Sequence, residues 1–222
     1  MKKIFTILGL VSATTIMFAQ TNLVQNPGFE SDLTSWAAGT GSGYTAPAIL
    51  TTNPHSGLKL AAYELPSATT GFYQNVAIAG STQYTLTFWY KASTARPEGT
   101  TQNNIFRLWS VMKDTTGTPV YNSATANDDP LRSNNGYLPI APTAWTQHTV
   151  VFTSHPSAAS IDVAFRSYGS GSSYVDDVQL VQGLLAVTDV SAFDKSVKMN
   201  TVVGNELRLI LPGKATVNIY SA

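Results

Sequence analysis

The chain of 222 residues contains no cysteine. Thiol catalysis, cysteine zinc sites and iron–sulfur clusters are therefore excluded, and an exported form would need its core or a bound metal for rigidity. Histidine is scarce as well, because only His55, His148 and His155 occur. A three-histidine zinc site would require all of them to converge. We do not expect one, since His148 sits in a strand-like run and the other two lie beside prolines.

Charge is also scarce, at 12% of the residues, and 13 basic side chains balance 13 acidic ones. No basic patch is visible in the sequence, which argues against a nucleic-acid partner. There is no phosphate-binding or dinucleotide-binding glycine motif, and residues 169–171 form a flexible Gly-Ser-Gly turn rather than a nucleophile elbow. No pair of acids stands in a context typical of a glycosidase. These absences favour a protein that is not an enzyme.

A secretory signal peptide is predicted over residues 1–19. Two lysines precede an apolar run that ends at Phe18, and Ala19 gives a small residue at a cleavage point that leaves Gln20 as the new N-terminus. The run is too short and too rich in hydroxyl groups to span a membrane, and no second one follows. Cleavage leaves 11 basic against 13 acidic side chains, a net charge near −2. We therefore expect a protein without a transmembrane span that is secreted or held at the outer cell surface.

Alternation of apolar and polar residues with a period of two predicts many short β-strands. In residues 84–91 (YTLTFWYK), Leu86 and Phe88 are expected on the core face. Residues 105–113 (IFRLWSVMK) and 160–168 (SIDVAFRSY) alternate in the same way. Further predicted strands are 59–64, 71–78, 146–153 and 173–181. Turn signals separate these strands, and no segment has a convincing helical period. The pattern predicts an all-β fold, a jelly-roll β-sandwich.

Two connections, 92–104 and 114–144, are long enough that we expect them to be functional or disordered. The composition changes near Gly183, and two alternating runs at 206–211 and 215–220 predict a short C-terminal β-hairpin. The predicted organisation is therefore a signal peptide at 1–19, the jelly roll at 20–183, and a linker with a partial C-terminal unit at 184–222.

Three stretches together resemble the carbohydrate-binding modules of families 4 and 9 and their jelly-roll relatives. They are 22–36 (NLVQNPGFESDLTSW), 71–93 (GFYQNVAIAGSTQYTLTFWYKAS) and 144–182, which contains YVDDVQL near its end. The resemblance implies a non-catalytic module that binds polysaccharide. Phe29, Trp36 and Trp145 are expected to fill the core of such a sandwich, where each buried ring contributes on the order of 2–3 kcal/mol.

The resemblance also implies a structural calcium ion. It maps Glu30 and Asp176 onto the side-chain ligands, with Asp177 as the alternative, and backbone carbonyls around Ser56 as further ligands. The first and last strands of a jelly roll often run side by side, so these acids could meet. Calcium prefers about six to eight oxygen ligands, and it would tie the chain ends together where disulfides are missing. The other interpretation is that the acids are solvated surface residues.

Ligand-binding residues are expected on the strand faces that point away from the core, and on the long loop. Flat aromatic rings meet the CH faces of sugars, and arginines donate hydrogen bonds to their oxygens. The predicted ligand contacts are Trp89, Arg107, Trp109, Arg166, Tyr168 and Tyr137. Tyr121, on the same long loop as Tyr137, could also fold over a ligand, and Tyr44 and Tyr63 are weaker candidates. An outward tryptophan is costly to solubility unless it is covered or used, so ordinary packing is the other interpretation of the two tryptophans.

The C-terminal stretch 197–222 (VKMNTVVGNELRLILPGKATVNIYSA) resembles the beginning of a C-terminal sorting domain of the type IX secretion system of the Bacteroidetes. The resemblance implies export through that machinery, followed by release or anchoring at the cell surface. The stretch departs from the family because it stops at Ala222, where members continue through further strands. An isolated two-stranded hairpin is marginal in water.

The sequence as a whole predicts a secreted or surface-bound, calcium-stabilised monomer that binds polysaccharide without cleaving it. Two alternatives stay open. An adhesion or structural β-sandwich would bind protein or a surface glycoconjugate through a flat face or an exposed strand edge. A glycoside hydrolase-associated enzyme with an unrecognised site would need two facing carboxylates in a pocket away from the calcium.

Overall fold

The computed structural model describes residues 20–93, 105–132, 138–169, 171–183, 198–199 and 209–210. The compact unit Gln20–Leu185 holds the strands β1 to β11. In a separate unit, β12 (Lys198–Met199) pairs antiparallel with β13 (Leu209–Ile210). The predicted signal peptide and most of the stretch that resembles a sorting domain lie outside the described residues. No helix in the part of the chain that the structure describes is long and apolar enough to cross a membrane.

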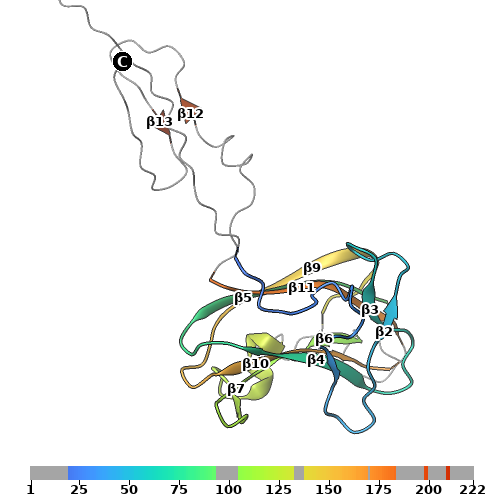
Figure 1. Ribbon diagram of the computed structural model, residues 1–222, viewed down its shortest axis with the longest axis horizontal. Coiled ribbons are helices and arrows are strands. Elements are labelled where there is room, and N and C mark those ends of the chain that lie inside the picture. Colours follow the sequence, from blue (N-terminus) through green and yellow to red (C-terminus); the bar gives the residue numbers. More distant parts are fainter. Residues whose placement is uncertain are drawn as a thin grey trace, which may run out of the picture. The chain divides into compact units, whose positions relative to one another are not determined.

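Two antiparallel sheets form the compact unit and appear as two layers in Figure 1. Sheet A has the order β1-β4-β10-β7-β8, with β6 also paired to β10, and sheet B has the order β2-β3-β11-β5-β9. The strands of sheet A are β1 (Ala37–Ala38), β4 (Thr70–Ala77), β6 (Phe106–Leu108), β7 (Val111–Lys113), β8 (Pro119–Val120) and β10 (Ser160–Ser167). Those of sheet B are β2 (Ala48–Leu50), β3 (Leu60–Tyr63), β5 (Gln83–Ala92), β9 (Ala141–Thr153) and β11 (Ser173–Gln182). The predicted jelly-roll β-sandwich is confirmed.

The core lies between the two sheets, as the alternation of apolar and polar residues along the strands predicts. Phe165 on β10 is at its centre, with its ring centroid 5.2 Å from that of Phe72, 4.8 Å from Phe88 and 5.9 Å from Phe106. All four rings are almost fully buried. Because burial of a ring of this size contributes about 2–3 kcal/mol, these aromatic contacts hold the sheets together in a chain that has no disulfide.

The N-terminal segment closes one side of the sandwich. Phe29 is fully buried and its ring lies 5.2 Å from that of Trp36, as expected from the sequence. Before it, the backbone runs along β11, where Leu23 N donates to Leu180 O (2.8 Å) and Val178 N donates to Pro27 O (3.0 Å). The first and last parts of the jelly roll therefore do lie side by side.

The expectation that Trp145 fills the core is wrong. The inward residues of β9 are Val150 and Phe152, which face Leu86 and Tyr84 across the ladder. Because side chains alternate along a strand, the odd-numbered Trp145 points outward, and its Nε1 donates to Asn53 O (3.2 Å).

The long connection 114–144 contains more structure than the sequence indicated. It includes β8, the start of β9, and two short 3₁₀ turns, η1 (Ala126–Asp128) and η2 (Pro130–Arg132). Of the other long connection, residues 94–104 lie outside the described part. The predicted strand 105–113 is interrupted between β6 and β7, which has a consequence for the site described next.

Candidate functional site

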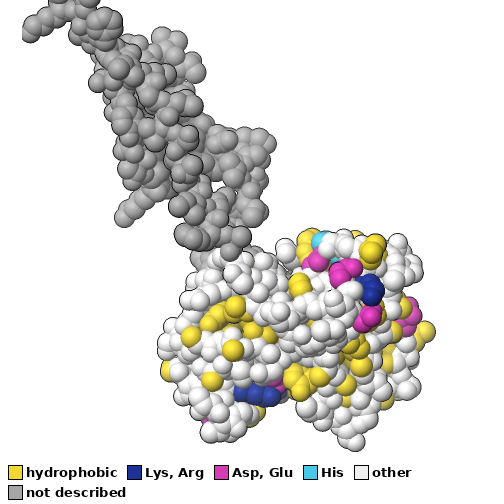
Figure 2. Space-filling model, in the orientation of Figure 1, with side chains coloured by type: hydrophobic (Ala, Val, Ile, Leu, Met, Phe, Trp, Pro, Cys, Tyr) yellow, Lys and Arg dark blue, Asp and Glu magenta, His cyan; other side chains and the backbone are white. Residues whose placement is uncertain are grey.

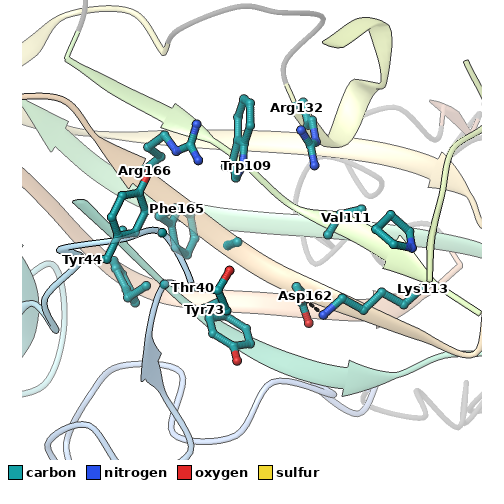
Figure 3. Close-up of a pocket in the computed structure, with 16 residues that line it drawn as sticks. Thr40, Tyr44, Tyr73, Trp109, Val111, Lys113, Arg132, Asp162, Phe165 and Arg166 are labelled. Carbon is teal, nitrogen blue, oxygen red and sulfur yellow. Dashed lines mark ion pairs between the residues drawn. The ribbon is translucent and has the colours of Figure 1, made fainter. Parts of the chain in front are cut away.

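A cavity of about 220 Å³ opens on the outer face of sheet A (Figure 3). Its floor is formed by outward residues of three adjacent strands, namely Tyr73 on β4, Ala164 on β10 and Val111 on β7. One wall is the segment from Gly39 to Tyr44, and the other includes Pro119 and Arg132. We call this cavity the sheet A groove.

An arginine–tryptophan stack, formed by Arg107, Trp109, Arg132 and Arg166, stands along this groove. The guanidinium carbons of Arg166, Arg132 and Arg107 lie 3.9, 4.1 and 4.3 Å from the Trp109 ring centre. Figure 3 shows Arg166 on one side of the ring and Arg132 on the other. Each such contact stabilises the stack by about 0.5–2 kcal/mol, so the guanidinium groups are held in fixed positions at the groove wall.

The break between β6 and β7 builds this stack. Trp109 N donates to Ala164 O (2.8 Å), while Ser110 N turns away to Leu131 O (3.0 Å). The fully buried Ser110 hydroxyl replaces a backbone partner, because its Oγ accepts from Ala164 N (2.9 Å). The Ser110–Leu131 bond fixes η2 against the sheet and so brings Arg132 onto Trp109.

The electrostatic environment of the stack is unfavourable to positive charge. Burial lowers the pKa of Arg132, and the nearby Arg166 and Arg107 lower it further, while Tyr121 and Asp129 act in the opposite direction. Arg132 donates to the Tyr121 hydroxyl (3.1 Å), and its carbonyl accepts from Arg107 (3.2 Å). Within the described part of the chain, the buried Nε atoms of Arg132 and Arg166 have no hydrogen-bond partner.

Among the residues that line the groove, Asp162 is the one carboxylate. It forms an ion pair with Lys113 (2.5 Å) and accepts from Asn75 (2.7 Å). The charges of Asp162 and Lys113 therefore cancel, while Arg132 and Arg166 keep theirs. On the opposite wall, burial raises the pKa of Tyr44 and Arg166 partly counteracts this, so the phenol stays protonated.

Several predicted ligand residues meet here. Arg107, Trp109 and Arg166 are in contact, and Arg166 lies 6.0 Å from the Tyr168 ring centre. Tyr137 lies outside the described residues. Trp109 does not present a bare ring to a sugar as expected, because guanidinium groups cover it on two sides.

The sequence did not single out Arg132, Lys113 or Tyr73 for the groove. Arg132 reaches the groove through the short 3₁₀ turn η2, which is too short to produce a periodic pattern in the sequence. Lys113 and Tyr73 lie on the outward faces of β7 and β4. The alternation of residues along these strands could have placed both on the outward face. That the groove residues bind a ligand stays a prediction.

Trp89 is not part of this groove, because β5 belongs to sheet B. Its ring stacks on His55 with centroids 3.9 Å apart and planes at 15°, and His55 meets Trp145 edge-on at 5.8 Å. Lys91 Nζ lies 4.6 Å from the Trp145 ring centre. These four residues form a second, half-buried aromatic surface on the outer face of sheet B.

The predicted metal ligands do converge. Glu30, Asp176 and Asp177, which we call the carboxylate cluster, all contact residues 55–59, and Figure 2 shows acidic side chains gathered near a histidine. Asp176 accepts from His55 N (2.8 Å) and Ser56 N (3.2 Å). The other contacts are Asp177 with His55 Nδ1 (2.5 Å) and Ser56 Oγ (2.8 Å), and Glu30 with Leu58 N (2.8 Å) and Lys59 N (3.0 Å).

A β-bulge lets both consecutive aspartates face this segment. The register of β11 against β5 shifts between Asp176 and Gln179, and Asp177 has a positive φ of 48°. Asp176 is fully buried, and burial, with Asp177 beside it, raises its pKa to about 6. In the described residues, no group of three or more His, Asp or Glu side chains is arranged as a metal site. The donor atoms are nevertheless the hard oxygens that calcium prefers.

No protein-family model and no curated protein matches this sequence. Solved structures match its fold. The enzymatically active domain of tailspike protein 4 of bacteriophage CBA120 has a TM-score of 0.56 and 16% identity, over 73% of this chain and 21% of that one. A family 16 carbohydrate-binding module has a TM-score of 0.50 and 23% identity, over 72% of this chain and 99% of that one.

A third match is the family 22 module and catalytic module of Clostridium thermocellum endo-1,4-β-D-xylanase 10B, complexed with xylohexaose. Its TM-score is 0.52 and its identity 15%, over 75% of this chain and 29% of that one. This chain thus spans about a fifth of the tailspike domain but nearly all of the family 16 module. At these identities the matches show a shared jelly-roll fold.

Proposed function

We propose that residues 20–183 form a non-catalytic module that binds polysaccharide in the sheet A groove. One observation carries the proposal: the outer face of a jelly-roll sheet is hollowed between two walls and lined by aromatic and hydrogen-bonding side chains. The named structures with the same fold support it, because one is a carbohydrate-binding module and another contains such a module in a two-module complex with xylohexaose.

The lining has the chemistry that a glycan needs. Tyr44 and Tyr73 offer ring faces and hydroxyl groups, and Thr40 adds a hydroxyl. Arg132 and Arg166 offer donors in a fixed planar arrangement. A few well-placed polar groups on a largely apolar floor are typical of small-ligand sites.

The same groove argues for binding over glycoside hydrolysis. Hydrolysis requires two carboxylates about 5–10 Å apart across the bond to be cut. Of the residues lining the groove, Asp162 alone is acidic, and Lys113 pairs with it. The adhesion alternative would use the aromatic surface of Trp89, His55, Lys91 and Trp145 on sheet B instead.

We further propose that the carboxylate cluster holds a structural calcium ion, with Glu30, Asp176 and Asp177 supplying carboxylate oxygens and the backbone around Ser56 supplying others. Bound calcium would offset the repulsion between Asp176 and Asp177. It would also join β11 to the 55–59 segment and to the N-terminal part of the domain. The convergence of all three acids on one short segment supports the proposal.

We also propose that the protein is exported. The predicted signal peptide at 1–19 and the stretch at 197–222 that resembles a type IX sorting domain support secretion, or attachment to the outer cell surface. A binding module in that place would hold an enzyme or a cell against an insoluble polysaccharide. We propose that it acts there as a monomer.

The test is native affinity electrophoresis of the mature chain, residues 20–222, in gels that contain soluble plant, algal, fungal or bacterial polysaccharides at constant calcium. Retardation by one class of glycan, lost in Trp109→Ala and kept in Lys59→Gln, is the expected result. A folded protein that no glycan retards would favour the adhesion alternative. Release of reducing ends from the retarding glycan would instead favour an enzyme.

A further inference from the structure

The positive charge of the sheet A groove is unlike the rest of the molecule. The chain balances 13 basic with 13 acidic residues, yet the groove lining contains Lys113, Arg132 and Arg166 against Asp162. Because Lys113 and Asp162 neutralise each other, two guanidinium charges remain. They lie in the hollow, where a ligand would sit.

Lys59 and Lys113 are paired with acids, whereas Lys91 lies over the rings of Trp145 and Tyr174. The ion pairs among the described residues are His55–Asp177, Lys59–Asp32 and Lys113–Asp162. None of them involves Arg132 or Arg166. The acid that influences Arg132, Asp129, is buried and turned toward the backbone, where it accepts from Leu131 N (2.9 Å). Within the groove lining, Lys113 therefore has an acid as its ion-pair partner, whereas Arg132 and Arg166 do not.

The stack holds its guanidinium groups in place without neutralising them. Trp109 separates Arg132 from Arg166 and contacts both, and cation–π attraction leaves the full positive charge on each. Burial and the mutual proximity of the arginines lower the pKa of Arg132, which shows that the charges are costly in this place. The buried Nε atoms of Arg132 and Arg166 have no hydrogen-bond partner in the described part of the chain.

Anionic groups on a ligand would compensate the charges of Arg132 and Arg166. A planar guanidinium binds a carboxylate or sulfate through two parallel hydrogen bonds, which are about twice as strong as neutral ones. A neutral hydroxyl can accept hydrogen bonds but leaves the repulsion between the arginines unchanged. An anionic ligand should therefore bind in the groove more tightly than a neutral one.

We infer that the polysaccharide bound in the sheet A groove is acidic, and that its carboxylate or sulfate groups bind Arg132 and Arg166. This inference rests on the proposed function and names the substrate class of the same site. The neighbouring rings of Tyr44 and Tyr73 then contact the sugar to which the anionic group is attached.

The experiment is isothermal titration calorimetry of the mature chain with matched polymers. Polygalacturonate supplies carboxylates, and the same polymer with its carboxyl groups reduced to alcohols is the neutral control. Carrageenan supplies sulfates, so the stronger of the two anionic polymers identifies the source of the charge. We expect an anionic polymer to bind at least about tenfold more tightly than the reduced one, and its affinity to fall as salt rises from about 50 to about 500 mM.

Single-residue variants test whether Arg132 and Arg166 bind the anionic groups of the ligand. Arg132→Gln and Arg166→Gln should each lower the affinity about tenfold or more, whereas Lys59→Gln, which removes the same charge from an ion pair outside the groove, should leave it within about twofold. Near-ultraviolet circular dichroism checks that each variant is folded. Should a glutamine variant not fold, Arg166→Lys keeps the charge but removes the planar fork, and an intermediate loss of affinity is expected.

The outcomes separate the two proposals. Equal binding of the reduced and anionic polymers, with no effect of the arginine variants, would overturn the inference and leave polysaccharide binding in place. Equal loss in Lys59→Gln and Arg166→Gln would mean unspecific attraction of polyanions and would also overturn it. Absence of binding to every polymer and to the neutral glycans of the electrophoresis test would overturn the proposed function itself.

Discussion

The carboxylate cluster and the arginine–tryptophan stack each gather three like charges, but they balance them differently. Every acid of the cluster accepts hydrogen bonds from residues 55–59, through backbone groups for Glu30 and Asp176 and through side chains for Asp177, so the protein itself satisfies it. In the stack, Arg132 and Arg166 meet the faces of Trp109 and line an open groove. This difference is the basis of our two proposals, that the cluster serves the fold and that the stack binds a ligand from outside. Four predictions test this division.

The largest expected effect is on stability. Asp176→Ala removes the acceptor for His55 N, Ser56 N and Asp177 N. A buried donor left without a partner costs about 1–3 kcal/mol, so we expect a loss of about 2–4 kcal/mol in the free energy of unfolding, measured with urea. Arg166→Gln should cost less than about 1 kcal/mol. The division would fail if Arg166→Gln destabilised the protein as much as Asp176→Ala.

Calcium should act on the cluster alone. At about 100 times its dissociation constant, a ligand bound only by the folded state adds about 2.7 kcal/mol, which raises the melting temperature of a domain of this size by several degrees. The rise, measured by calorimetry with and without a chelator, should vanish in Asp176→Asn and persist in Arg166→Gln. An unchanged melting temperature in the wild type would contradict the proposed calcium site.

Alkaline pH should destabilise the fold through Tyr63. Tyr63 donates to Thr45 O (2.6 Å), next to Tyr44, and burial raises the pKa of Tyr63 to about 12. Since the unfolded state loses this proton first, near pH 10, the free energy of unfolding should fall by about 2 kcal/mol between pH 10 and 12. Urea titrations of Tyr63→Phe should show a smaller fall. An equal slope in wild type and variant would assign the effect to other groups.

The smallest expected difference concerns two glycines with positive φ. Gly57 (φ 60°) lies against Glu30, and a Cβ there would overlap Oε1 of that side chain, whereas Gly117 (φ 84°) has open space. Left-handed backbone alone costs about 1–2 kcal/mol for alanine. Gly57→Ala should therefore destabilise by about 1 kcal/mol more than Gly117→Ala in chemical denaturation. Equal losses would show that Glu30 is free to move away.

Much of the fold could be predicted because alternation reports which way a side chain points. The inward residues of β5 and β10, and the outward Arg107 and Trp109, follow that rule. Alternation does not report which sheet a strand joins. For that reason alternation could not separate Trp89 and Trp109, both predicted ligand contacts, although β5 lies in sheet B and Trp109 lies beside β10 of sheet A.

Other features of the site depend on irregular backbone, which leaves no period in the sequence. The bulge at Asp177 brings two consecutive acids to one segment. The break at Ser110 holds the 3₁₀ turn that carries Arg132. The acids of the cluster were found through a family resemblance rather than through a pattern, and Arg132 had no such guide.

The pairing of the N-terminal segment with β11 has a consequence for the order of events during folding. Asn22 Nδ2 donates to Val178 O and Asn22 Oδ1 accepts from Leu180 N, contacts that join residues more than 150 positions apart. Asn22 and Leu23 thus lack these partners until the last strand of the domain has been made. Chains dominated by such distant contacts fold slowly, in milliseconds to seconds. A domain closed by its last strand therefore stays unfinished throughout its synthesis.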